Sequence, residues 1–191
     1  MRIFTQGSCL VAAMVCGQQA IADMVQVKTP APVIHLADNL DEADGLGWCI
    51  DTVGRGFADT LHAHSCKPQG GDVQFAFEVA SGAIRSAAFE GKCMQVSAPG
   101  ATTDFSLLDC DATVSAQIFT FDNESGTIRP QDAPHTCVAA GAESRSAGPF
   151  MSRDLILAPC DDVSESHRRW VIVPSTQKSP RQCEGFLCRC K

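Results

Sequence analysis

The sequence of 191 residues contains no tyrosine and only two tryptophans, and aromatic residues make up 6% of it. So few large side chains leave a folded chain with a modest core, which makes covalent support valuable. No apolar stretch approaches the roughly 20 residues that a membrane-spanning helix needs. Basic residues number 15 against 22 acidic ones and form no stripe. The phosphate attraction that nucleic-acid binding requires is therefore missing, and we exclude nucleic acid as a partner.

The first 22 residues have the order of features typical of a secretory signal peptide. Arg2 provides a positive start, "CLVAAMV" a short apolar segment, and "AIA" (residues 20–22) a small-residue cleavage site before Asp23. A cytosolic N-terminal helix is the alternative. Nine of the eleven cysteines follow residue 22, and in an oxidising compartment they are candidates for disulfides. We therefore expect a secreted or periplasmic protein.

A thirteen-residue segment occurs twice, as "VQFAFEVASGAIR" at residues 73–85 and as "QIFTFDNESGTIR" at residues 117–129, 44 positions apart. The cysteines keep the same period, since Cys49, Cys93 and Cys137 are 44 residues apart and so are Cys66 and Cys110. Cys160 follows after 50 residues, because the third copy is longer. The extra residues are best placed in "AGAESRSAGPFMSRD", whose Gly, Ser and Ala content predicts a lengthened surface loop. The chain therefore consists of three repeats.

Apolar residues alternate within each repeat, as at Leu61 and Ala63, Phe105 and Leu107, and Leu155 and Leu157. This period of two predicts strands with one buried face, and the repeated glycine marks a hairpin turn. No window after residue 45 predicts an amphipathic helix. We expect an all-β fold in which three units share one core, each clipped by its own disulfide. The expected pairs are Cys49–Cys66, Cys93–Cys110 and Cys137–Cys160.

The threefold pattern C-I-D…L-x-A-x-x-C…F-x-F…G-x-I-R resembles the ricin B-type lectin domain family. The Gln-x-Trp element of that family is best kept as Gln117-Ile118-Phe119 and is altered in Val73-Gln74-Phe75 and Arg168-Arg169-Trp170. The resemblance covers about residues 40–173 and implies a β-trefoil fold. It also implies that Gln117 ties a strand to neighbouring backbone, and that Phe75, Phe119 and Trp170 belong to the core.

Sugar pockets in the resembled family use a carboxylate two residues after the first cysteine and an aromatic platform two residues before the second. The carboxylate accepts hydrogen bonds from two hydroxyls, and the ring covers the C–H face of the sugar. Only the first repeat keeps much of this set, and the implied carbohydrate-binding residues are Asp51, His64, Lys67 and Asp72. The second repeat has Gln95 and Leu108 at the two key positions, and the third has Ala139 and Ala158.

Three of these site residues also have a structural explanation. Asp51 can cap the turn after Cys49, His64 can be a surface histidine on a strand, and Lys67 can be a solvated lysine. Phe57 or Trp48 can replace His64 as the platform.

The two ends of the chain differ from its middle. Residues 23–45 contain Pro30, Pro32 and an acidic cluster, which predict an extended arm or linker, although strands can start near residue 40. Residues 46–173 form the predicted trefoil. Residues 174–191 form a basic tail, and its cysteines at 183, 188 and 190 are too few for a four-ligand zinc site. A local disulfide with one free or intermolecular cysteine is the simpler arrangement, so we expect no metal.

We interpret the sequence as a secreted, non-catalytic, carbohydrate-binding protein whose partner is a glycan or glycoconjugate. No motif such as G-x-S-x-G provides a nucleophile, so neither an enzyme nor a cofactor is expected. The alternative is a binding or delivery subunit of an exported toxin-like assembly, of the kind represented by cytolethal distending toxins. Such a subunit requires a protein partner, which we expect to contact the N-terminal arm or the Cys-rich tail.

Overall fold

The computed structural model describes residues 25–175, which fold almost entirely into β-strands. The predicted signal peptide and the three tail cysteines lie outside the described residues. The described chain has twelve strands, a short helix α1 (Glu165–Arg168) and two single turns of 3-10 helix, Ser115–Gln117 and Cys160–Asp162. The strands are β1 (Val33–Leu36), β2 (Trp48–Thr52), β3 (Leu61–Ser65), β4 (Phe75–Glu78), β5 (Ala83–Ser86), β6 (Lys92–Val96), β7 (Phe105–Asp109), β8 (Phe119–Asp122), β9 (Thr127–Pro130), β10 (Thr136–Ala147), β11 (Phe150–Pro159) and β12 (Trp170–Val173). The predicted all-β class is confirmed.

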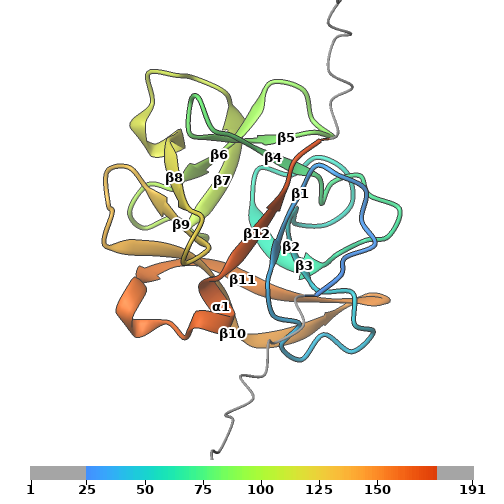
Figure 1. The fold of residues 1–191 in the computed structure, drawn as a ribbon. Helices are drawn as coiled ribbons and strands as arrows, with labels where there is room; N and C mark the ends of the chain where they lie inside the picture. The colour runs from blue at the N-terminus through green and yellow to red at the C-terminus, as the bar shows by residue number, and fades with distance from the viewer. Residues whose placement is uncertain (1–24, 176–191) are drawn as a thin grey trace, which may run out of the picture.

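The strands pair only in antiparallel fashion within the described chain and form three sheets (Figure 1). The largest sheet has the order β10-β11-β3-β2-β1-β12, the second β4-β5-β6-β7, and β8 and β9 form a separate ribbon. Consecutive strands joined by short turns dominate this arrangement, as the alternating pattern and the repeated glycine turns predict. None of the helices found between residues 25 and 175 has the length and apolar character needed to cross a membrane.

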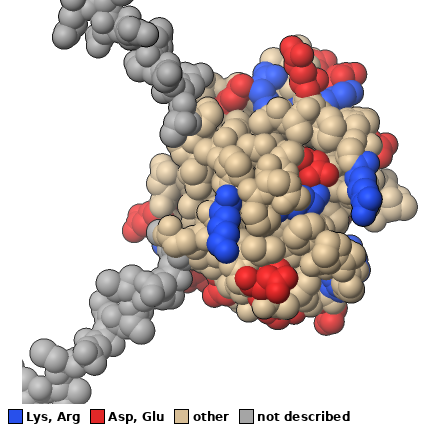
Figure 2. Space-filling model, turned by 90° about the vertical axis from the view of Figure 1, so that its right-hand side faces the viewer, with Lys and Arg blue, Asp and Glu red and all other residues tan. Residues whose placement is uncertain are grey.

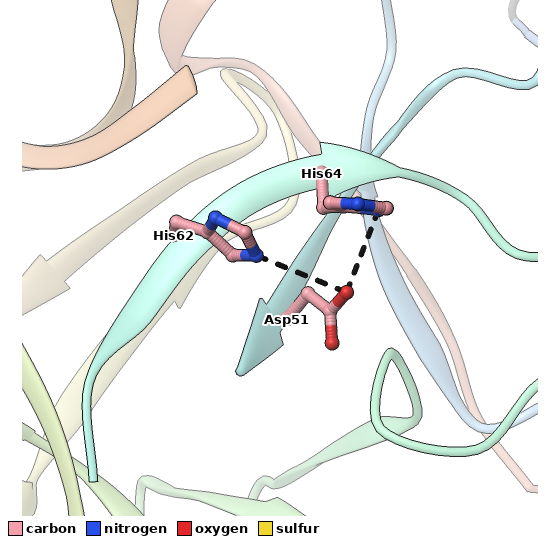
Figure 3. Close-up of side chains that lie close together, drawn as sticks. All are labelled: Asp51, His62 and His64. Carbon is pink, nitrogen blue, oxygen red and sulfur yellow. Dashed lines mark ion pairs between the residues drawn. The ribbon is translucent and has the colours of Figure 1, made fainter. Parts of the chain in front are cut away.

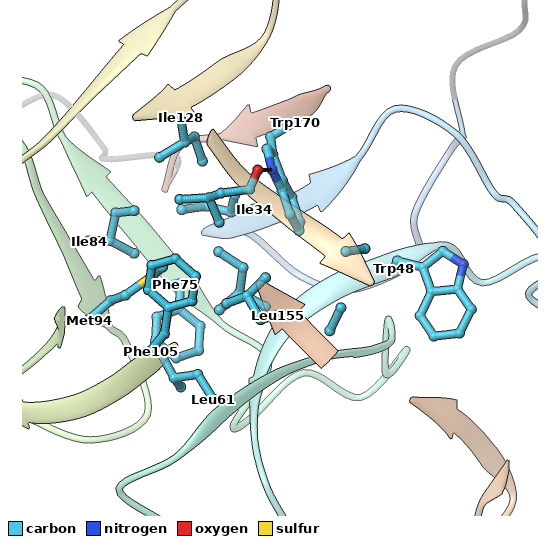
Figure 4. Packing of buried hydrophobic residues seen from close by; sticks show 14 of the residues in the cluster. Ile34, Trp48, Leu61, Phe75, Ile84, Met94, Phe105, Ile128, Leu155 and Trp170 are labelled. Atoms are coloured by element: carbon cyan, nitrogen blue, oxygen red, sulfur yellow. Dashed lines mark hydrogen bonds between the residues drawn. The ribbon is translucent and has the colours of Figure 1, made fainter. Parts of the chain in front are cut away.

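One core collects the inward side chains of all three sheets (Figure 4). Phe75, Phe119 and Trp170 are fully buried in it, as the sequence predicts. The indole Nε1 of Trp170 donates a hydrogen bond to the carbonyl of Val138, 2.8 Å away, so this buried donor has a partner. The core therefore depends on a few large rings contributed by different parts of the chain.

Between residues 25 and 175, three disulfides each join the two strands of one hairpin at its open end. They link Cys49 to Cys66, Cys93 to Cys110 and Cys137 to Cys160, across sequence separations of 17, 17 and 23 residues. These are the pairs that the sequence predicts. Closing a loop of this size restricts the unfolded chain and adds about 3 kcal/mol to stability in the chain-entropy description.

The turns that contain the repeated glycines Gly82 and Gly126 each contact a strand of the next repeat, β8 for Gly82 and β12 for Gly126. The amide of Phe119 donates to the carbonyl of Gly82 at 2.8 Å, and the amide of Trp170 donates to the carbonyl of Gly126 at 2.7 Å. Both glycines have positive φ, 72° and 68°, and a Cβ at Gly82 would lie 2.5 Å from the carbonyl oxygen of Phe119. The duplicated segment thus encodes a contact between neighbouring units as well as a hairpin turn.

Strand β1 lies inside the segment where the sequence predicts an arm or linker. Its four residues are buried, and it pairs with β12 from Val33↔Val173 to Leu36↔Trp170. Pro32 directly before the strand ends the irregular approach, and proline is tolerated at such a strand start. The folded body therefore begins well before residue 46, and β1 joins the two ends of the described chain (Figure 1).

The segment where the sequence predicts a lengthened surface loop is instead a long hairpin formed by β10 and β11. The two strands stay paired as far as Ala147↔Phe150, with a register shift between Ala140 and Ser144. Buried Arg153 holds the irregular part, because its guanidinium donates to the carbonyls of Gly141 and Ala142, both at 2.6 Å. Since β11 also pairs with β3, the extra residues of the third repeat extend over the first.

Candidate functional site

The register of β2 and β3 brings Asp51, His62 and His64 to one face of the sheet. Asp51 lies opposite His62, and Cys49 opposite His64, and residues that pair across strands share a face. Figure 3 shows the three side chains pointing toward one another from the two strands. His62 Nε2 and His64 Nδ1 lie 3.9 Å and 3.5 Å from Asp51 Oδ2.

Lys67 completes the cluster and connects it to Asp72. Its ammonium lies 2.7 Å from Asp51 Oδ2 and donates a hydrogen bond to Asp72 Oδ1, also at 2.7 Å. Asp51 is 0% exposed, whereas the side chains of Lys67 and Asp72 keep 11% and 15% of their surface open. The structure therefore brings the four predicted site residues together, with Asp51 beneath the surface and Lys67 and Asp72 above it.

The charges of the cluster stabilise one another. Burial by itself raises the pKa of Asp51, but the neighbouring His62 side chain and the Lys67 ammonium outweigh it, so the pKa lies below its ordinary value. Burial also disfavours the charged form of Lys67, yet its two carboxylate partners raise its pKa. Asp51 and Lys67 are thus both charged at neutral pH. Asp51 Oδ1 also accepts the amide of Thr52 at 2.7 Å, within β2, so no turn is capped there.

His64 is too enclosed to offer an open ring face. It is buried, its Nδ1 lies 2.9 Å from the carbonyl of Ser65, and its ring is flanked by His62 and Phe150 at centroid distances of 5.1 and 5.4 Å. Burial lowers its pKa, which the hydrogen bond to Ser65 and the Asp51 charge only partly oppose. His64 is therefore a neutral, packed side chain near pH 7.

The lowered pKa of His64 predicts that acid weakens the fold. In the unfolded chain a histidine binds its proton as pH falls through 6.5, whereas the folded chain binds it only at lower pH. Stability present above that value is thus lost as pH falls toward the folded pKa. We expect the free energy of unfolding, measured by urea denaturation, to fall between about pH 7 and pH 5.

His64→Gln should make this decline shallower, and His135→Gln, at an exposed histidine, should leave it unchanged. Buried His35, whose pKa burial also lowers, keeps part of the decline in both variants. An identical decline in the His64→Gln variant would show that His64 does not titrate as argued.

A hollow of about 570 Å³ opens above the cluster. Its walls include His62, His64, Lys67 and Asp72, the loop at residues 54–56, and the hairpin tip at residues 147–150. This volume is in the range of small-molecule sites. The hollow is thus built mainly by the first repeat, and its remaining wall comes from the third.

Asp51, His62 and His64 are also a set of metal-ligand types whose donor atoms lie within 4.8 Å of one another. The Lys67 ammonium, however, already lies 2.7 Å from the Asp51 carboxylate. His64 Nδ1, the nitrogen that faces Asp51, lies 2.9 Å from the Ser65 carbonyl. The position of a cation is therefore occupied by the lysine, and we assign no metal to this cluster.

The corresponding positions of the other repeats are arranged differently. Gln95 accepts a hydrogen bond from Gln117 Nε2 at 3.0 Å, and Gln117 also bonds the backbone of Asp109 and Asp111. Gln117 thus ties strands together, as the resemblance implies. A second hollow, of about 550 Å³, lies beside the Cys93–Cys110 disulfide. Arg85 in its lining pairs with Glu78 at 2.7 Å, but both of these side chains are partly exposed, unlike buried Asp51.

Neither aromatic alternative to His64 faces the first hollow. Trp48 is fully buried with the Arg153 guanidinium 4.9 Å from its ring centre, and Phe57 packs edge-on against Phe89 at 5.3 Å. The aromatic side chain in the wall is Phe150, which the sequence analysis missed because it placed this residue in a surface loop.

The chain matches the family model described as "Ricin-type beta-trefoil lectin domain" over residues 80–183. No curated protein matches it in sequence. The matched segment begins after Asp51, His64, Lys67 and Asp72, so the family match itself does not include the cluster.

Several solved structures are similar to the described fold. They include the β-trefoil lectin of the Vibrio vulnificus hemolysin/cytolysin with N-acetyl-D-lactosamine bound (17% identity, TM-score 0.52, covering 76% of this chain and 95% of that one). An agglutinin from Abrus precatorius is also similar (14%, 0.51, 76% and 48%), as is GalNAc-T7 with UDP, GalNAc and Mn2+ (14%, 0.50, 76% and 23%). This chain thus spans less than half of the last two proteins. At such identities the likeness establishes the fold alone, which is a β-trefoil.

Proposed function

Because this chain belongs to the ricin-type β-trefoil lectin domain family, we propose that it is an exported, non-catalytic protein that binds carbohydrate in the hollow of its first repeat. The observation that carries this proposal is the Asp51–Lys67–Asp72 chain of ion pairs, with both distances 2.7 Å. Lys67 and Asp72 line the hollow, and Asp51 lies buried beneath Lys67. The three disulfides support export, since they persist in oxidising compartments.

Sugar hydroxyls both donate and accept hydrogen bonds, and the hollow offers a partner for each role. The Lys67 ammonium is a donor and the Asp72 carboxylate an acceptor, 2.7 Å apart, which matches neighbouring hydroxyls on one ring. Charge-assisted hydrogen bonds are the stronger kind. Asp51 acts from below, because it holds the ammonium in place while staying out of solvent. His64 fills the space beside it and supports the wall.

Figure 2 shows basic and acidic side chains interspersed over the face in view, without a gathered patch of either sign. A single shallow sugar site binds weakly, so useful avidity requires several copies on one surface or a partner that supplies a second site.

A glycan array tests the proposal directly. The oxidised chain from residue 23 should bind a restricted set of glycans, and N-acetyl-D-lactosamine is the first defined probe because the similar Vibrio vulnificus lectin was solved with it. An excess of free sugar should displace the protein. An array without any displaceable binding would contradict the proposed function.

The alternative, a delivery subunit of an exported toxin-like assembly, also uses a glycan site and adds a protein partner. Size-exclusion chromatography with light scattering on material purified from its exporting cells distinguishes the two. A single-chain mass supports the stand-alone lectin, whereas a stoichiometric second polypeptide supports the subunit.

A further inference from the structure

The long hairpin of the third repeat carries an aromatic side chain into the wall of the first-repeat hollow. In the pairing of β11 with β3, Ser152 lies opposite His64 and Asp154 opposite His62. Side chains two residues apart on a strand share a face, so Phe150 lies on the same face as the two histidines. It stands one step beyond His64 toward the tip of the hairpin.

Phe150 is the flat, partly exposed ring of the hollow. Its ring meets the His64 ring edge-on, at a centroid distance of 5.4 Å and an angle of 63°, and it is half-buried where His64 is buried. Pro149 and Gly148 continue the same wall. His64, at the aromatic position of the first repeat, is therefore covered. The exposed apolar ring surface of the hollow belongs instead to Phe150 on the hairpin.

Several contacts hold the β10–β11 hairpin in the position that places Phe150 in the wall of the hollow. The Ser65 hydroxyl accepts the amide of Met151 at 2.9 Å and donates to Glu42 Oε1 at 2.8 Å, in the interior of the protein. Farther along β11, Arg153 pairs with Asp41 and packs against the Trp48 ring. Met151 and Arg153 follow Phe150 on β11, and these contacts hold both of them in place. The Phe150 ring therefore has little freedom to move and is preorganised for contact with a ligand.

From this geometry we propose that Phe150 is the platform on which the bound sugar stacks, and that it selects pyranoses with an uninterrupted C–H face. Lys67 and Asp72 then meet the hydroxyls at the sugar's edge, across the hollow from an apolar ring. The inference rests on the proposed function, since it concerns the same hollow, but it assigns specificity to a residue of the third repeat.

Binding of N-acetyl-D-lactosamine, and of the glycan with the strongest array signal, to the full exported chain tests this inference by calorimetry. Phe150→Ala should weaken both by about tenfold, because stacking and apolar contact are lost. Phe150→Trp should retain or strengthen binding, and Phe150→Leu should behave like the Ala variant, since it keeps apolar volume without a flat face. Phe57→Ala, at a half-exposed ring outside the hollow, is the matched control and should bind like the unaltered protein.

The Phe150→Trp variant adds a direct readout, because sugar stacked on the new indole should change its fluorescence, while the unaltered protein with its two buried tryptophans should show little change. Normal binding by Phe150→Ala, with the unaltered protein binding sugar, would overturn the inference and leave the proposed function standing. Failure of every variant and of the unaltered protein to bind any glycan would overturn both.

Discussion

Replacing Asp51 with asparagine is expected to lower glycan affinity by about 10- to 100-fold, because hydrogen bonds to charged groups contribute about 1.5–3 kcal/mol. The amide has nearly the shape of the carboxylate but no charge, so the Lys67 ammonium loses the partner 2.7 Å below it and follows Asp72 alone. The Lys67 ammonium then leaves the position in which it can donate a hydrogen bond to a sugar in the hollow. Calorimetric titration with the strongest array glycan measures the effect.

Asp109→Asn is the matched control for Asp51→Asn. Asp109 also pairs with a lysine, Lys92, at 2.8 Å, but its side chain is 90% exposed and lies in the second repeat. Surface pairs of this kind contribute about 0–1 kcal/mol, so neither affinity nor stability should change. Equal affinities for the Asp51 and Asp109 variants would contradict the assignment of the site to the first repeat.

Gly82→Ala is expected to destabilise the fold strongly. A residue with a Cβ pays about 1–2 kcal/mol in the left-handed conformation that Gly82 adopts at φ 72°. The new methyl group would also lie 2.5 Å from the Phe119 carbonyl oxygen, and relieving such overlap costs about 1–3 kcal/mol more. Urea denaturation should therefore show a loss of about 2–5 kcal/mol.

Gly91→Ala separates the two contributions. Gly91 has nearly the same backbone angle, φ 70°, but a Cβ there meets nothing within 4 Å. It should lose only the conformational part, about 1–2 kcal/mol. If both variants lost the same stability, the contact between the hairpin turn and the next repeat would not be a determinant of the fold.

The sequence predicts the fold well because its signals are local and repeated. The alternation around Phe75 and Phe119 and the glycine at each turn depend on residues that are neighbours along the chain. The spacing of Cys49, Cys93 and Cys137 shows that the pattern recurs every 44 residues. The all-β class and the membership of the ricin-type family are accordingly confirmed, and the disulfides join the predicted partners.

Features that depend on long-range pairing were not predictable in the same way. Strand β1 forms because buried Val33–Leu36 finds a partner in β12, more than a hundred residues later. Phe150 becomes part of the hollow only because β11 pairs with β3. Nothing local to "SAGPFM" indicates this contact, so its Gly-Pro sequence predicts a loop.

The candidate site was predictable in its members but not in its arrangement. The resemblance to the ricin B-type lectin domain family implies Asp51, His64, Lys67 and Asp72, and the structure brings them together. That Asp51 lies beneath Lys67, and that His64 is enclosed by His62 and Phe150, follows from packing in three dimensions. Because of this packing, the exposed aromatic ring of the hollow is Phe150 of the third repeat and not His64 of the first.

Amide chemical shifts recorded while the strongest array glycan is titrated into isotope-labelled protein locate the bound sugar. Our account predicts that the shifts concentrate around the first hollow, at residues 54–56, 69–72 and 147–150. Shifts concentrated instead around Ser81, Asp111 and Gln117, beside the Cys93–Cys110 disulfide, would place the sugar in the second hollow and contradict it.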